Sequence, residues 1–235
     1  METSQKDPIM VMGLHRSGTN YVQQCLELNY NVQQIGNGKR EYDRMWKHHT
    51  LTKDLAQILD SEYKATFFVV RHPIKWLNGV VKFCANLWKT YPVTSSAVND
   101  KEDWLTVPYK DLLETRGIKL DIEKLIYVWN RFHEYWLFQN YFKNFHFIYY
   151  HDMLDLEFRS LELEKISKKY NFKELEKTSF LTPNVVEHSS PWSSFKTKQE
   201  LDLDYTPNLN DYQLGFAYES FDERVIGEIQ ARRKR

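Results

Sequence analysis

The chain has 235 residues, and its 32 lysines and arginines balance 32 aspartates and glutamates, so the formal net charge at pH 7 is zero. Such a balance gives no global electrostatic field toward nucleic acid or an anionic membrane surface. No apolar run approaches the roughly twenty residues that cross a bilayer, and the polar N-terminus is unlike a signal peptide. We therefore expect one cytoplasmic domain over residues 1–235, with neither nucleic acid nor membrane as a partner.

Strands and helices alternate in the first part of the chain. An apolar run over residues 8–12 predicts a strand, and the periodic segment over about residues 18–29 predicts a helix. An irregular segment from Gly36 to His49 follows, then a short helix marked by leucines and isoleucine over residues 51–59. The continuous apolar run over residues 65–70 is typical of a strand that is buried on both faces.

The second part continues this alternation. It predicts a helix at about residues 74–89, a polar loop at 91–118 and a long helix with one apolar face at 122–142. A strand at 145–150 and two further helices at about 160–170 and 221–231 follow. Strands separated by helices predict an α/β fold in three layers, with a mostly parallel sheet flanked by helices on both faces. Ligands of such sheets bind at the carboxyl ends of the strands. The residues that follow each strand are therefore the candidates for a site.

The most informative motif joins the first strand to the first helix and reads Gly13-Leu14-His15-Arg16-Ser17-Gly18-Thr19-Asn20. A tight loop that enters a helix presents unpaired N–H groups and the positive end of the helix dipole to an anion. A nucleotide triphosphatase loop reads Gly-x4-Gly-Lys-Ser/Thr, with lysine on the phosphates and the hydroxyl on magnesium. Here the glycines have that spacing, but Thr19 and Asn20 stand at the lysine and hydroxyl positions. The loop is suited to hold a phosphoryl group without a metal.

The segment Arg16-Ser17-Gly18-Thr19 resembles the 5′-phosphosulfate loop of the PAPS-dependent sulfotransferases, in which PAPS is 3′-phosphoadenosine-5′-phosphosulfate. Two later segments resemble the same family. Arg71-His72-Pro73 follows the strand over residues 65–70, as the family's Arg-x-Pro does. Tyr150-His151-Asp152-Met153-Leu154 resembles a Tyr-Glu-Asp-Leu-like segment, with His151 in place of glutamate. The resemblance spans roughly residues 8–170 and implies a P-loop-NTPase-like sulfotransferase fold.

The resemblance also implies how the nucleotide binds. The loop would wrap the phosphosulfate of PAPS with the residues His15, Arg16, Ser17, Gly18, Thr19 and Asn20, and Arg71 would bind the 3′-phosphate. The family usually has a serine eight residues after this arginine, where this chain has Gly79. Asn78 and Lys82 share a helix face with Gly79, and either of them is a candidate for the missing contact. His151 lies in a segment that is structural in the family, so we do not expect it in the active site.

Sulfuryl transfer needs a base for the acceptor proton and a cation near the bridging oxygen. The candidates follow the first helix. Lys47 would neutralise the leaving phosphate, and His48 or His49 would take the proton, because an imidazole titrates near pH 6.5. Glu41 is the alternative base, since some branches of the family use a glutamate soon after this helix. Helix capping by Lys47 and the histidines is the competing interpretation.

The resemblance thus implies transfer of a sulfuryl group from PAPS to a hydroxyl or amine of a carbohydrate or small molecule, leaving 3′-phosphoadenosine-5′-phosphate (PAP), with no metal required. Two alternatives stay open. One is a nucleotide or small-molecule kinase with a degenerate P-loop. The other is a catalytically inactive nucleotide-binding protein, which Gly79 in place of the usual serine favours.

Overall fold

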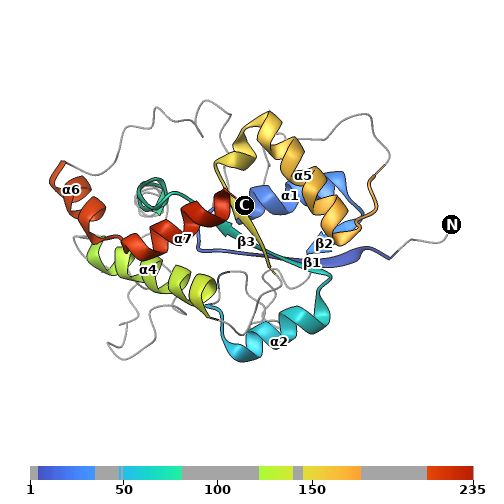
Figure 1. Ribbon diagram of the computed structural model, residues 1–235, viewed down its shortest axis with the longest axis horizontal. Coiled ribbons are helices and arrows are strands. Elements are labelled where there is room, and N and C mark those ends of the chain that lie inside the picture. Colours follow the sequence, from blue (N-terminus) through green and yellow to red (C-terminus); the bar gives the residue numbers. More distant parts are fainter. Residues whose placement is uncertain are drawn as a thin grey trace, which may run out of the picture.

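The computed structural model describes residues 5–34, 48, 50–80, 122–139, 145–175 and 211–234. Within these ranges the chain forms a four-stranded sheet with the strand order β2-β1-β3-β4 (Figure 1). The strands are β1 (Asp7–Met12), β2 (Val32–Gln34), β3 (Ala65–Val70) and β4 (Phe145–Tyr149). All neighbouring pairs are parallel, which confirms the predicted α/β class and the parallel sheet.

The two inner strands, β1 and β3, carry the continuous apolar runs. Ile9 of β1 pairs with Gln34 on one side and with Ala65 on the other. Strand β3 pairs in turn with β4, from Thr66 opposite Phe145 onward. A strand with neighbours on both edges and helices on both faces meets no water, and every residue of β3 is buried.

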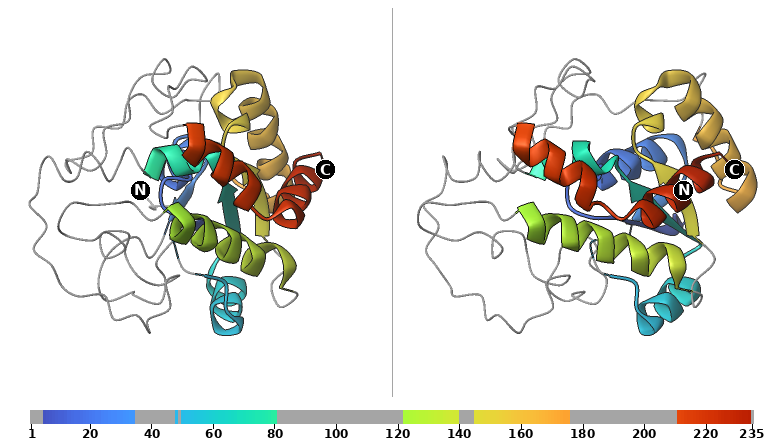
Figure 2. Two further views of the ribbon diagram at one scale, coloured as in Figure 1. Left: turned by 90° about the vertical axis from the view of Figure 1, so that its left-hand side faces the viewer. Right: turned by 60° about the vertical axis from the view of Figure 1, so that its left-hand side comes forward.

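Helices cover both faces of this sheet. They are α1 (Thr19–Asn29), α2 (Lys53–Glu62), a helical segment over residues 73–80, α4 (Ile122–Phe138), α5 (Leu156–Tyr170), α6 (Asp211–Ser220) and α7 (Glu223–Arg233), with a short 3-10 turn, η3 (Asp152–Leu154), before α5. Alternate side chains of β1 enter different cores: Ile9 and Val11 pack with α1 and α5, whereas Met10 and Met12 pack with the remaining helices. Figure 2 shows α2 and α4 on one side of the strands and α5 on the other.

The larger core is built on α4, whose aromatic stripe was predicted from its spacing. Trp129, Phe132 and Trp136 are fully buried. The ring of Trp136 stacks on Phe68 of β3, with centroids 4.6 Å apart and planes 11° from parallel. Burying a side chain of this size stabilises the fold by about 1.5–3 kcal/mol. Helix α4 is therefore held to the sheet mainly by aromatic packing.

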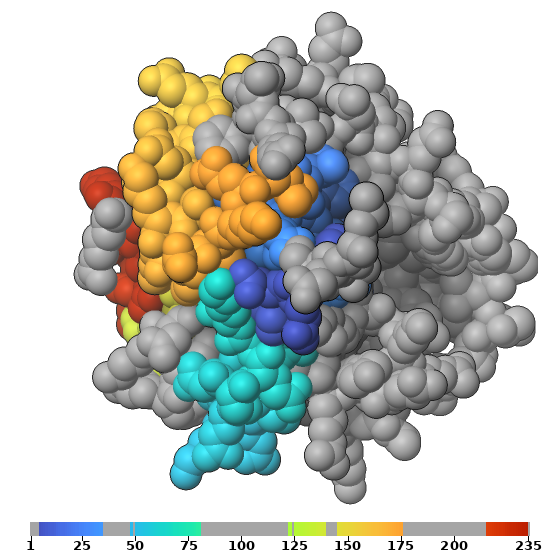
Figure 3. Space-filling model, turned by 90° about the vertical axis from the view of Figure 1, so that its right-hand side faces the viewer, coloured from blue at the N-terminus to red at the C-terminus, as the bar shows by residue number. Residues whose placement is uncertain are grey.

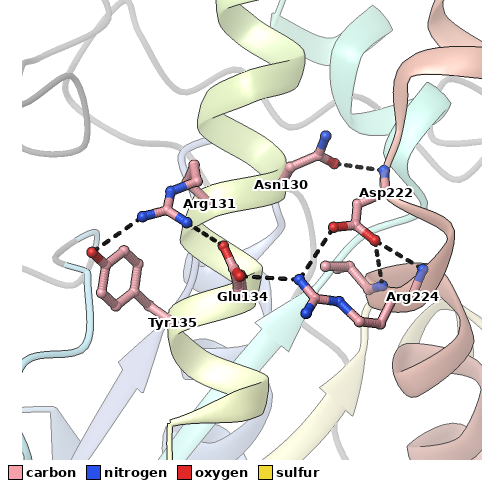
Figure 4. A network of polar contacts seen from close by, with 7 residues as sticks. Asn130, Arg131, Glu134, Tyr135, Asp222 and Arg224 are labelled. Carbon is pink, nitrogen blue, oxygen red and sulfur yellow. Dashed lines mark hydrogen bonds and ion pairs between the residues drawn. The ribbon is translucent and has the colours of Figure 1, made fainter.

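A polar network joins α4 to α7 although the two helices are far apart in the sequence (Figure 4). Glu134 accepts hydrogen bonds from Arg131 at 2.5 Å and from Arg224 at 3.0 Å. The side chain of Asn130 accepts from the backbone N–H of Asp222, whose carboxylate caps the start of α7. These contacts are partly exposed, so they set the orientation of α7 more than they add stability.

The residues after α5 connect it to the start of the sheet. The N–H of Asn31 donates to the carbonyl oxygen of Lys173 at 2.8 Å. Lys64 bridges the carboxylate of Asp7 at 2.7 Å and the carbonyl oxygen of Asn171 at 3.2 Å. Figure 3 shows this orange segment against the blue start of β1. The contacts anchor α5 at the amino end of β1, away from the candidate site.

The structure differs from the predicted elements in several places. Helix α5 begins at Leu156 rather than near residue 160, because the carboxylate of Asp155 accepts from the N–H groups of Glu157 and Phe158 and so caps an earlier start. Strand β2 and helix α6 were not predicted at all. The loop predicted over residues 91–118 lies outside the described residues. None of the helices in the described ranges is long and apolar enough to span a bilayer.

Candidate functional site

The candidate site lies where β1, β3 and β4 end side by side. The loop of residues 13–18 leaves β1, Arg71 follows β3 directly, and Tyr150 and His151 follow β4. Because these strands are parallel and adjacent, the three segments meet at one edge of the sheet. The N–H of Tyr150 donates to the carbonyl oxygen of Val70 at 2.8 Å, which extends the pairing of β3 and β4 to this edge.

Two glycines give the loop its shape. Gly18 has φ 92° and ψ 17°, a left-handed conformation that suits a residue without a side chain. A Cβ atom placed on Gly18 would lie 2.1 Å from the ring of Tyr150, and one placed on Gly13 would lie 2.6 Å from the carbonyl oxygen of Val69. Both positions therefore require glycine for close packing against the ends of β3 and β4.

The loop enters α1 with the features of an anion site. An α-helix leaves the N–H groups of its first turn without an intrahelical acceptor, and here the N-cap, Gly18, has no side chain to accept from them. No acidic residue lies in the first turn to oppose the positive end of the helix dipole. Next to it, the hydroxyl of Ser17 is buried and has no hydrogen-bond partner among the described residues. An oxygen of a bound phosphoryl group would supply the missing acceptor.

Arg71 is joined directly to this loop. Its Nη1 donates to the carbonyl oxygen of Arg16 at 3.0 Å, and its guanidinium lies 5.4 Å from the centre of the Tyr150 ring. A Cβ atom on Gly79 would lie 2.8 Å from the same Nη1 and 3.9 Å from the Cβ of Arg16. The absence of a side chain at Gly79 therefore provides the space in which Arg71 reaches the loop. The structure brings Arg16, Arg71 and Gly79 together.

Asn78 and Lys82 were the candidates for the contact that Gly79 cannot make, and the structure describes only Asn78. Asn78 is buried, and its Oδ1 has no hydrogen-bond partner among the residues that the structure describes. Lys82 lies outside the described ranges. Thr19 is buried at the start of α1, and its methyl group lies 3.1 Å from the position that a Cβ atom on Gly13 would take.

Of the four catalytic candidates, the described residues include His48, whereas Lys47, His49 and Glu41 lie outside them. His48 is buried against the loop. Its ring stacks on that of His15 with centroids 3.7 Å apart, and its Nδ1 lies 2.5 Å from the carbonyl oxygen of Gly13.

This contact defines the chemistry of His48. A carbonyl oxygen can only accept, so Nδ1 of His48 carries a proton and donates it. In a neutral imidazole the other nitrogen, Nε2, is then the basic atom. The backbone of His15 is held as well, since its carbonyl oxygen accepts from the indole N–H of Trp76 at 2.8 Å. The loop and the helical segment over residues 73–80 thus fix the ring pair from two sides.

The structure also brings His72 and His151 to this edge, which the sequence analysis did not place in the site. Burial, followed by the positive charges of Arg71 and Lys75, lowers the pKa of His151 to about 3. Burial and Lys75 lower the pKa of His72 as well. His151 therefore lies within the electrostatic reach of the predicted phosphate-binding arginine. Its place directly after the predicted strand over residues 145–150 was the sequence signal for a position at the carboxyl end of the sheet.

The described residues contain no cluster of three histidine, cysteine, aspartate or glutamate side chains that could hold a metal ion. Comparison with known proteins gives no significant match to a family model, to a curated protein or to a solved structure. The fold and the arrangement of the site therefore carry the functional argument.

Proposed function

We propose that the chain is a PAPS-dependent sulfotransferase with a P-loop-like fold, which transfers a sulfuryl group to a hydroxyl or amine of a carbohydrate or small molecule. The observation that carries this proposal is the hydrogen bond between Arg71 and the carbonyl oxygen of Arg16. It joins two cationic residues at the ends of adjacent strands, next to the loop that enters α1. A nucleotide with phosphates at both its 5′ and 3′ positions matches two such anion-binding elements.

The composition of the loop favours this donor over a metal-bound triphosphate. Thr19 and Asn20 replace the lysine and the magnesium-binding hydroxyl of a nucleotide triphosphatase loop. The backbone N–H groups of the first turn of α1 and the buried hydroxyl of Ser17 would hold the 5′-phosphosulfate, and Arg71 would take the 3′-phosphate. Nothing in this arrangement requires a metal ion.

In the proposed reaction the acceptor attacks sulfur in line with the bridging oxygen, by analogy with phosphoryl transfer. The bond from sulfur to the bridging oxygen breaks, the bond from sulfur to the acceptor forms, and PAP leaves. The acceptor proton goes to the basic Nε2 of His48, whose other nitrogen is held by Gly13. Lys47, adjacent in sequence, is proposed to stabilise the charge that develops on the bridging oxygen.

The first experiment compares ligands by thermal unfolding. PAP without magnesium is expected to stabilise the protein by about 2.7 kcal/mol at one hundred times its dissociation constant. Arg71→Ala should weaken PAP binding by about 1.5–3 kcal/mol, the usual contribution of a charge-assisted hydrogen bond. Arg131→Ala, which removes an arginine that pairs with Glu134 of α4, should leave PAP binding unchanged. Stabilisation by ATP with magnesium, combined with indifference to PAP, would instead establish the kinase alternative.

The same experiment continues with turnover, using PAPS and a panel of phenols, amines and monosaccharides. His48→Asn keeps an amide N–H to donate to the carbonyl oxygen of Gly13 but removes the basic Nε2. It should lower turnover about a hundredfold or more while PAP still binds. A wild-type chain that binds PAP but modifies no acceptor in the panel would favour the inactive nucleotide-binding protein, and an active His48→Asn variant would return the role of base to His49 or Glu41.

A further inference from the structure

Two histidines that the proposed reaction does not use lie at the ends of neighbouring strands. His72 follows Arg71 after β3, and His151 follows Tyr150 after β4, and the last paired residues of these strands are Val70 and Tyr149. The Nδ1 atom of each histidine is buried and has no hydrogen-bond partner among the described residues. Buried polar atoms are rarely left in this state, and two of them beside a cationic side chain indicate a place for a ligand oxygen.

The charges around these imidazoles are mainly positive. Arg71 at the end of β3, Lys75 in the helical segment over residues 73–80 and Arg233 of α7 all act on His151. The nearby carboxylate of Asp152 already accepts from Arg233 at 2.8 and 2.6 Å, so that pair adds no net charge.

The remaining neighbours are neutral. The rings of Tyr149 and Tyr150 lie 5.5 and 5.6 Å from that of His151, and burial raises the pKa of both phenols, which keeps them protonated at neutral pH. The described groups that face His151 therefore amount to an excess of positive charge without a free carboxylate.

This surrounding field gives the histidines a specific response to an anion. Burial and the neighbouring cations keep both imidazoles neutral at pH 7 when no ligand is present. A phosphate dianion placed among Arg71, Lys75 and the histidines reverses the sign of the local field and favours the protonated imidazolium. Protonation at one nitrogen turns a neutral imidazole into a donor at both, which strengthens its hydrogen bond to a phosphate oxygen.

We propose that His72 and His151 complete the subsite in which Arg71 takes the 3′-phosphate of the nucleotide, and that the phosphate binds there as a dianion with uptake of a proton by the histidines. The identity of the ligand rests on the proposed function. Gly79 offers no hydroxyl to this phosphate, and the two imidazoles take the place of that contact. The nucleotide therefore binds more tightly as the pH falls toward 6.5.

Calorimetric titration tests this, with PAP and with adenosine 5′-phosphate, which lacks the 3′-phosphate. Each ligand is titrated at pH 6.5, 7.5 and 8.5 in two buffers that differ in ionisation enthalpy. Binding of PAP is expected to be accompanied by uptake of close to one proton, and the affinity to fall by up to tenfold for each pH unit until the pH exceeds the pKa of the histidine in the complex. Phosphate monoesters titrate near pH 6, so adenosine 5′-phosphate corrects for the titration of the 5′-phosphate, and the 3′-phosphate is already mainly a dianion at pH 6.5 and above.

The variants His151→Gln and His72→Gln should each reduce the proton uptake and flatten the pH dependence for PAP. His146→Gln is the matched control, since His146 lies within β4, five residues before His151, but pairs with Glu162 of α5 at 2.6 Å. Should either site variant fold poorly, imidazole NMR signals of the wild-type protein, followed with and without PAP, report the same protonation directly.

The outcomes separate the two proposals. PAP that binds with the same affinity from pH 6.5 to 8.5 and without proton uptake overturns the role of the histidines and leaves the sulfotransferase proposal standing. Failure of PAP to bind at any of these pH values overturns both. A pH dependence that survives in both histidine variants assigns the proton to another group and refutes the subsite.

Discussion

The loop glycine at the start of α1 offers a quantitative test of the site's geometry. Gly18→Ala places a methyl group where the ideal Cβ lies 2.1 Å from Cδ2 of Tyr150, a ring that is only 3% exposed. The backbone at φ 92° costs an alanine roughly 1–2 kcal/mol, and forcing a methyl group into a packed core costs roughly 1–3 kcal/mol. The free energy of unfolding should therefore fall by about 2–5 kcal/mol, a large share of the 5–15 kcal/mol typical of a protein.

Denaturant unfolding of four variants separates the two contributions. Tyr150→Leu removes the ring, so Gly18→Ala in that background should cost only the backbone part, about 1–2 kcal/mol. Gly227→Ala is the control. This glycine lies in α7, and apart from its chain neighbours and the backbone of its own helix nothing lies within 4 Å of its ideal Cβ, so the alanine variant should be more stable by up to about 1 kcal/mol. Equal costs of Gly18→Ala in the two backgrounds would refute the packing of the loop against Tyr150.

Two further substitutions test ligand binding at Gly79 and the pH dependence of stability at His133. Gly79→Ala should leave the melting temperature unchanged or higher, because alanine favours a helix by about 1 kcal/mol over glycine. It should nevertheless lower the affinity for PAP about tenfold, because the new Cβ occupies the space 2.8 Å from Nη1 of Arg71. Calorimetry that shows an unaltered PAP affinity would contradict this. His133 is fully buried with a pKa of about 3, and its Nδ1 donates to the carbonyl oxygen of Trp129 at 2.7 Å. In the unfolded chain this imidazole takes up its second proton near pH 6.5, whereas in the folded state it stays neutral. The free energy of unfolding should therefore fall by about 2 kcal/mol between pH 7 and pH 5 on account of this histidine. Urea unfolding at both pH values should show that loss reduced in His133→Phe, and an unchanged difference would rule the histidine out as its source.

The main strands and several helices were predictable because their residues carry strong local signals. The apolar runs over residues 8–12 and 65–70 correspond to β1 and β3, which are buried on both faces. The spacing of the aromatic residues in α4 places them on one face of the helix, and that face packs on the sheet. Elements without such signals were missed: β2 is only three residues long, Val32-Gln33-Gln34, with a single apolar side chain, and it pairs along one edge of β1.

The candidate site was only partly predictable. The loop from Gly13 to Asn20 carries its chemistry within a few consecutive residues, and the structure places it at the strand end where it was expected. Gly79 was noted as a departure from the sulfotransferase pattern, but its effect depends on Arg71, whose guanidinium lies within 3 Å of the position that a Cβ would take. Such a contact joins a strand end to a helix and has no local signature.

By itself the sequence determined the parallel α/β class, the buried strands and the loop before α1, since these follow from hydrophobic period and glycine spacing along short segments. Only the tertiary structure decided that Arg71 and His151 lie together at the end of the sheet. Their proximity depends on the pairing of β3 with β4, which are separated by more than seventy residues. Which strands become neighbours is decided by the packing of helices on the two faces of the sheet, and that packing is a property of the whole fold.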